Sequence, residues 1–237
     1  LGLSRAAPTG SGSNYVHVLT SGAGPTDTAT LLQKWANDSW TWDLGVALAS
    51  FAIRMSKAET VARIDMTLIG LKDAEDDEAP SGTVASAYAA DQSLSDWRWA
   101  VYWNDTLIGD ALTLNLNGDL GVERIQGMSG DEWPTRHHFG EQVFSGEMTL
   151  YGRAEAFRTL GAAGTPGELT IRATHPSDPT NRLIEFELAQ TQFAKPQRVV
   201  NGGGQMSASL SFEASQTASA PALKVTVKNS VSTYTPA

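Results

Sequence analysis

The sequence predicts a mainly β protein, a sandwich or barrel with one or two short helices and long loops. Three observations favour this class: apolar and polar residues alternate with a period of two in several stretches, turn residues separate these stretches, and helical periodicity is rare. With 237 residues, 41% of them hydrophobic and 18% charged, the chain is long enough to bury a sizeable core. We expect one β-sandwich domain at 15–229, a flexible N-terminal arm at 1–14 and a C-terminal tail at 230–237.

Several hairpins are expected from the alternation. An alternating segment that ends at Ile53 is joined by the polar turn Ser56–Glu59 to a second segment that starts at Ile64. The Trp-rich segment 97–103 alternates strictly and is followed by Asn104-Asp105, a typical turn. The alternation of 112–116 ends at Asn117-Gly118, a pair that favours a two-residue hairpin turn. Later strands are expected at Gln142–Tyr151, Gly167–Thr174, Leu183–Leu188, Met206–Ala214 and Ala222–Lys228.

Two helices and two long loops complete this prediction. Thr28–Asn37 places Leu31, Leu32 and Trp35 on one helical face, and Arg153–Leu160 precedes Gly161, a suitable helix stop. The segments Lys72–Asp96 and Gly118–Glu141 are expected to be loops. Loops longer than about 15 residues in a compact domain are usually functional or become ordered on a partner, so these two favour an assembly role.

The charge is unevenly distributed along the chain. The formal net charge of −9 argues against a protein that binds nucleic acid by neutralising phosphates. Acidic residues are frequent between Asp65 and Asp110, whereas the segment from Ala194 onward has only Glu213 against the basic residues Lys195, Arg198, Lys224 and Lys228. Such polarity can orient identical copies head to tail.

The residues that carry chemistry do not combine into a recognisable catalytic or metal site. The chain has no cysteine, which removes thiol nucleophiles, disulfides and Cys-ligated metals. His137-His138 are neighbours, and neighbours in a strand point to opposite faces, so a surface position is favoured over a metal site. The acidic run 73–78 lacks the glycine and the final Glu of an EF-hand loop. We therefore expect no enzyme activity, cofactor or metal. A hydrolase with a carboxylate pair is the least favoured alternative.

Two further features bear on the class of protein. No segment approaches the roughly 18 apolar residues of a membrane helix, and Leu1–Asn14 lacks the pattern of a signal peptide. The tryptophans cluster at 35–42 and 97–103. Such clusters either pack in the core or form a binding surface, so a carbohydrate-binding β-sandwich stays open as an alternative.

Four segments carry a resemblance to a known family. The stretch 42–53, the aromatic string Trp99–Asp105, the strand Phe144–Tyr151 and the final pair formed by Leu210–Ala214 and Ala222–Asn229 resemble, in this order, strands of the tail tube proteins of long-tailed bacteriophages. The resemblance covers most of residues 40–229. The acidic segment Lys72–Asp91 and the tail Ser230–Ala237 depart from the pattern.

This resemblance implies a structural virion protein made in the host cytoplasm. It implies a β-sandwich subunit, copies of which form a ring of six, and rings that stack into a tube. Its partners would be further copies of itself, tail terminator and baseplate proteins, and the tape-measure protein and phage DNA that pass the lumen without specific binding. Another ring protein of the tail, such as a terminator or baseplate component, is the close alternative. No membrane is involved.

The resemblance also suggests roles for individual residues. Asp65 is our candidate for a lumen-facing residue, because an acidic channel repels phosphates. The candidates for contacts between rings lie in the two predicted loops, namely Asp73, Glu75, Asp76, Asp77, Glu78, Glu132, Trp133 and Arg136.

Overall fold

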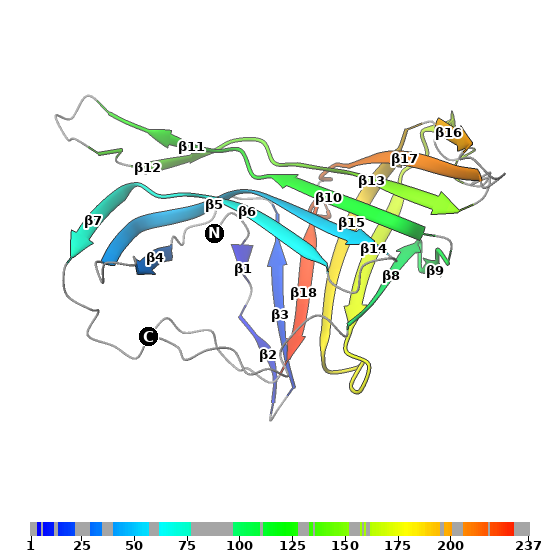
Figure 1. Cartoon of the computed structure of the whole chain (residues 1–237), viewed down its shortest axis with the longest axis horizontal. Coiled ribbons are helices and arrows are strands. Elements are labelled where there is room, and N and C mark those ends of the chain that lie inside the picture. The colour runs from blue at the N-terminus through cyan, green and yellow to red at the C-terminus, as the bar shows by residue number, and fades with distance from the viewer. Residues whose placement is uncertain are drawn as a thin grey trace.

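A computed structural model of the protein describes residues 4–5, 7–11, 14–21, 29–34, 40–56, 62–76, 97–109, 111–127, 133–134, 136–151, 157, 159, 162–194, 197–200, 206–217 and 219–229. Strands dominate these residues, which confirms the mainly β class. Most of the strands join into one antiparallel path that bends into two layers, which cross at a steep angle in Figure 1. We name the layers the upper and the lower sheet, as they lie in that view.

The upper sheet consists of five neighbouring strands and a short sixth one. Their order is β6 (Arg63–Ile69), β5 (Trp40–Ser56), β10 (Ala111–Asp119), β13 (Val143–Tyr151), β17 (Met206–Ala214) and β16 (Gln197–Val200). Every neighbouring pair is antiparallel. Residues in these strands therefore point alternately into the sandwich and away from it.

The lower sheet covers the inner face of the upper one. It contains β3 (Asn14–Thr20), β18 (Lys224–Asn229), β15 (Leu183–Phe193), β14 (Gly167–Thr174) and β8 (Arg98–Trp103), with β1 (Ser4–Arg5), β2 (Thr9–Ser11) and β9 (Thr106–Leu107) at its edges. β15 belongs to both layers. Leu183–Glu187 pairs with β18, whereas Thr191–Phe193 pairs with β17. This shared strand joins the two sheets by backbone hydrogen bonds at one corner.

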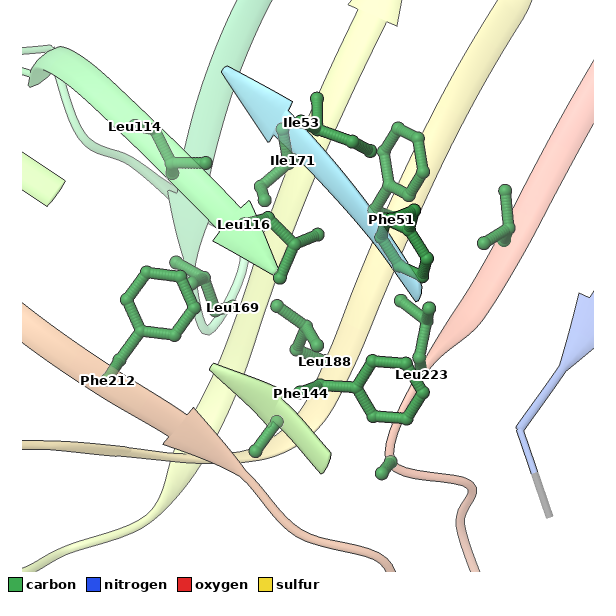
Figure 2. Packing of buried hydrophobic residues seen from close by; sticks show 14 of the residues in the cluster. Phe51, Ile53, Leu114, Leu116, Phe144, Leu169, Ile171, Leu188, Phe212 and Leu223 are labelled. Carbon is green, nitrogen blue, oxygen red and sulfur yellow. The ribbon is translucent and has the colours of Figure 1, made fainter. Parts of the chain in front are cut away.

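The core lies between the sheets and is built from the inward residues of both (Figure 2). In the upper sheet, Leu116, Phe144 and Met148 have no exposed surface, and in the lower sheet the same holds for Leu169 and Leu188. Burying a side chain of this size contributes about 1.5–3 kcal/mol. The alternation read from the sequence is thus the pattern that fills this core.

Two arms extend beyond the sandwich on the left of Figure 1. The first arm consists of Trp40–Leu44 of β5 with β4 (Ala29–Lys34) on one side and β7 (Lys72–Asp76) on the other. The second arm is the hairpin of β11 (Val122–Ile125) and β12 (Arg136–Phe139), which continues from β10 and β13. The first arm shares β5 with the upper sheet, and the second arm lies between β10 and β13 in the chain.

Several predicted elements are confirmed. β14 and β17 have the predicted bounds, and the hairpin of β5 and β6 is present. Asn104 and Asp105 have φ values of 44° and 62° and form the turn between β8 and β9. Positive φ is tolerated by Asn and Asp better than by most residues, which is why this pair was a useful turn signal.

Other predictions were wrong. Ala29–Lys34 is strand β4 instead of part of a helix, because it pairs with β5, and a single short amphipathic helix is only marginally stable by itself. Asn117-Gly118 is not a turn: β10 continues to Asp119, and Asn117 lies opposite Ala52 in the middle of the sheet. Here the cross-strand pairing overrides the local turn preference.

The two long loops are also shorter than predicted. Lys72–Asp76 is strand β7, and the segment 118–141 contains β11 and β12. Within the expected N-terminal arm, Ser4–Arg5 and Thr9–Ser11 are strands that pair with β3, so these residues are not loose. Phe157 and Thr159 have helical backbone, but the rest of Arg153–Leu160 lies outside the described residues, as does 230–237.

Candidate functional site

The outer face of the upper sheet is a broad polar surface that several described strands form together. Alternation places small hydroxyl, amide and acidic residues on it from every strand. We call this surface the polar face; its residues are Arg63, Asp65 and Thr67 of β6, Ser50, Ala52, Arg54 and Ser56 of β5, Thr113, Asn115, Asn117 and Asp119 of β10, the exposed apolar residue Val143 with Ser145, Glu147, Thr149 and Tyr151 of β13, and Ser207, Ser209, Ser211 and Glu213 of β17.

The strand register arranges these residues in rows across the face. One row runs from Asp65 through Ala52, Asn117 and Ser145 to Glu213. Neighbouring members of a row lie directly opposite each other, so their short side chains pack side by side. Because most of the side chains are short, the face is a wide, shallow surface without a deep cleft.

The charges on the polar face are mainly negative. It carries the carboxylates of Asp65, Asp119, Glu147 and Glu213 against the guanidinium groups of Arg54 and Arg63. Arg54 Nη2 lies 3.7 Å from Asp65 Oδ2, and both side chains are about two-thirds exposed, at 65% and 66%. The Ser209 hydroxyl donates a hydrogen bond to Glu147, and Asp119 accepts one from the Gly121 amide at 2.9 Å.

A shallow hollow of about 610 Å³ crosses β10, β13 and β17 on this face. Its polar lining includes Asn115, Glu147, Gln192, Ser211 and Glu213. These amides, hydroxyls and carboxylates offer both donors and acceptors, and the hollow is open to solvent. Its chemistry is that of a hydrated surface.

β6 forms an open edge of the upper sheet and exposes apolar residues there. Ile64, Met66 and Leu68 are 44%, 63% and 39% exposed. Ile64 and Met66 lie opposite the core residues Ile53 and Phe51, so they continue the inner side of the sheet beyond the part that the lower sheet covers. We call these three residues the apolar edge. Among the described strands β6 pairs only with β5.

Among the described residues, the outer face of the lower sheet carries two ion pairs between neighbouring strands. Lys224 Nζ lies 2.6 Å from Glu187 Oε2, and Arg172 forms an ion pair with Glu185 and lies 5.0 Å above the Tyr102 ring. Burial alone would lower the pKa of Arg172, but the hydrogen bond and charge of Glu185 raise it above its ordinary value. These cross-strand pairs hold the strands in register.

The structure brings the predicted site residues that it describes to three regions. Asp65 lies on the polar face. Asp73, Glu75 and Asp76 are part of β7 in the first arm, and Arg136 begins β12 in the second arm, where Trp133 is 38% exposed. Asp77, Glu78 and Glu132 lie outside the described residues.

Sequence reasoning missed most of the polar face. Asp119, Glu147 and Glu213 were not proposed, although Ser207, Ser209 and Ser211 alternate with buried residues up to Glu213 and could have indicated it. The apolar edge was missed because alternation predicts a buried side for every strand. It does not say whether that side is covered.

The tryptophans in and next to β8 are involved in packing. Trp97, Trp99 and Trp103 are half-buried, and the rings of Trp103 and Phe193 contact each other in a tilted arrangement at 4.7 Å between ring centres. This packing favours the core reading of the 97–103 cluster over an exposed sugar-binding platform. In the turn after β14, the Ser177 hydroxyl lies 2.8 Å from His175 Nδ1, which is a local contact across two residues.

Within the described ranges, no three His, Asp or Glu residues are grouped as ligands for one metal ion. The described residues also include no helix of sufficient length and hydrophobicity to cross a membrane.

The sequence was compared with family models and with curated proteins. No family model matches the chain, and no curated protein matches it significantly.

Proposed function

We propose that this protein is the tail tube subunit of a long-tailed bacteriophage, a structural protein of the virion. The observation that carries the proposal is the pairing of a broad, mainly acidic polar face with an open apolar edge on the same sheet. A neighbouring copy that pairs with this edge would bury its apolar side chains. The polar face would stay in contact with water. A ring with this face toward the axis meets both conditions.

The polar face is suited to line a channel for DNA. Most of its side chains are short hydroxyl and amide groups, and the excess of carboxylates repels phosphates, so that DNA slides without binding. In this arrangement Asp65, Asp119, Glu147 and Glu213 face the lumen. The net charge of −9 agrees with a channel that avoids specific DNA contacts.

The strand directions support ring closure. Five antiparallel steps separate β6 from β16, so the two edge strands run in opposite directions. A copy rotated about an axis along the strands brings its β16 side toward β6 in antiparallel orientation, the commoner pairing in proteins. Open edges are liabilities in a monomer and become pairing sites in an assembly. Such a head-to-tail contact closes into a ring, for which we propose six copies.

The arms are suited to contact the next ring. They extend beyond the sandwich along the strand direction of the upper sheet, which is the tube axis in this arrangement (Figure 1). The candidates there are Asp73, Glu75 and Asp76 of β7 and Trp133 and Arg136 of the second arm, together with Asp77, Glu78 and Glu132. The tape-measure protein and DNA would pass the lumen, and terminator and baseplate proteins would cap the tube.

Electron microscopy of the purified protein over a range of concentrations and salts tests this function. We expect rings and hollow tubes whose length grows with concentration. A protein that stays monomeric at high concentration in all salts would contradict the proposal. Single rings that never polymerise would instead indicate a terminator or baseplate ring. A change in Trp fluorescence on titration with glycans, without assembly, would favour the carbohydrate-binding alternative.

A further inference from the structure

The two arms leave the upper sheet through bends that need glycine. Gly45 in β5 and Gly121 after β10 have φ values of +63° and +59°, a region that other residues rarely adopt. A Cβ on Gly121 would lie 2.5 Å from the Glu141 carbonyl oxygen, and one on Gly45 would lie 2.9 Å from Leu71 Cδ1. At each bend, both the backbone conformation and a closely packed neighbour favour glycine over residues with a side chain.

A side-chain hydrogen bond connects the second arm to the bend of the first arm. His137 of β12 lies with its Nε2 atom 2.5 Å from the carbonyl oxygen of Gly45, 92 residues away in the sequence. A carbonyl oxygen can only accept, so Nε2 carries the proton and donates. The hydrogen bond thus runs from the second arm to the bend of the first arm.

The surroundings of His137 hold the imidazole ring in this position. The ring is partly buried and lies 6.1 Å from the ring of Phe139, two residues along the strand. Its Nδ1 atom is buried and has no hydrogen-bond partner among the described residues, so the contact with Gly45 is the polar interaction that orients the ring. The neighbour His138 is exposed and points to the opposite face of β12.

We propose that His137 is a positioning residue that locks the two arms together, so that they have one fixed relative orientation before any partner binds. Each arm has few strands, and a two-stranded hairpin is only marginally stable by itself. The second arm therefore depends on a contact with its neighbour for a defined direction. The lock is a property of the isolated chain, so it can be tested whether or not the protein forms tubes.

Spin-label distance measurements on the isolated chain test this lock. The chain has no cysteine, so a pair of introduced cysteines is labelled uniquely. Suitable exposed positions are Lys72 in the first arm and Glu123 in the second. We expect one narrow distance distribution for the otherwise unchanged chain. A broad distribution would overturn the proposal, because the arms would then move independently.

Substitutions test whether His137 is the residue that fixes the relative orientation of the two arms. His137→Phe keeps an aromatic ring next to Phe139 and removes the donor, so it should broaden the distribution and speed hydrogen exchange in β11 and β12 by about three- to tenfold, the effect of one lost hydrogen bond. His137→Gln retains an N–H donor and should restore part of the order.

His138→Phe is the matched control, because it changes the adjacent exposed histidine. It should leave both the distances and the exchange rates unchanged. If the two Phe variants behave alike, or if His137→Phe leaves the distribution narrow, the proposal is wrong. Exchange in β14 and β15 reports on the sandwich itself, so rates there that rise together with those of the arm would indicate general unfolding and contradict a specific lock.

Discussion

Gly118 lies directly opposite Phe51 in the upper sheet, and the phenyl ring occupies the space in which a side chain at position 118 would lie. A Cβ added to Gly118 would be 2.6 Å from Phe51 Cζ. Phe51 also packs on Phe144, at 6.3 Å between ring centres, so its ring cannot move away freely. A glycine is thus required in the middle of a strand because of packing and not because of a turn.

This relationship predicts that Gly118→Ala destabilises the protein. Overpacking of a core usually costs about 1–3 kcal/mol, and we expect a decrease of that size in the free energy of unfolding measured by urea titration. Gly109→Ala is the control, since a Cβ at Gly109 meets no atom within 4 Å. Equal stability of the Gly118→Ala and wild-type proteins would mean that the ring of Phe51 is free to shift.

The apolar edge predicts a variant that folds and does not assemble. Met66 is 63% exposed, so Met66→Asp should change the free energy of unfolding by less than about 0.5 kcal/mol, as is usual for surface substitutions. Assembly should be lost, because a charge would be buried at the seam between copies. Sedimentation velocity and electron microscopy measure this.

Thr67→Asp is the matched control for the edge, because it places the same charge on the adjacent residue of β6, on the polar face. We expect this variant to assemble. Loss of assembly in both variants would show only that β6 does not tolerate negative charge, and would count against the apolar edge as the contact.

The polar face predicts a variant that gains DNA binding. Glu213→Lys replaces a negative by a positive charge on the face, so each subunit changes by two charges and a tube by many. Assembled tubes should then bind DNA in a salt-dependent way, because attraction to phosphates releases counterions. Filter binding at two salt concentrations measures this.

Glu123→Lys makes the same charge change on β11, away from the polar face, and serves as the control. Its tubes should bind less DNA than those of Glu213→Lys. The opposite ranking would place the lumen on another surface of the protein.

We predict that the ion pair on the outer face of the lower sheet contributes more coupling free energy than the ion pair on the polar face. The Glu185 side chain is only 13% exposed, whereas both members of the Arg54–Asp65 pair are largely in solvent. A double-mutant cycle on Arg172 and Glu185 should give a coupling free energy of about 1.5–3 kcal/mol, and the cycle on Arg54 and Asp65 about 0–1 kcal/mol. Urea unfolding of the single and double variants measures both. Similar couplings would mean that burial does not strengthen the Arg172 pair.

Local pattern in the sequence determined the fold class and most of the strands. The alternation of Met206–Ala214 and Gly167–Thr174 predicted two strands with their bounds, since side chains in a strand point alternately to core and solvent. Asn104-Asp105 predicted its turn because the required backbone conformation is local. The absence of cysteine and the net charge of −9 likewise needed no structure.

Only the tertiary structure decided which segments meet. Asn117-Gly118 has the composition of a turn, but β5 and β13 pair with it on both sides, and the hydrogen bonds of two neighbours outweigh a local preference. Ala29–Lys34 became a strand for the same reason. The polar face and the contact of His137 with Gly45 join residues that are far apart in the chain, and the apolar edge is exposed because of what does not cover it among the described strands. Periodicity describes one segment at a time, so it could predict each residue's side of its strand but not its neighbours in space.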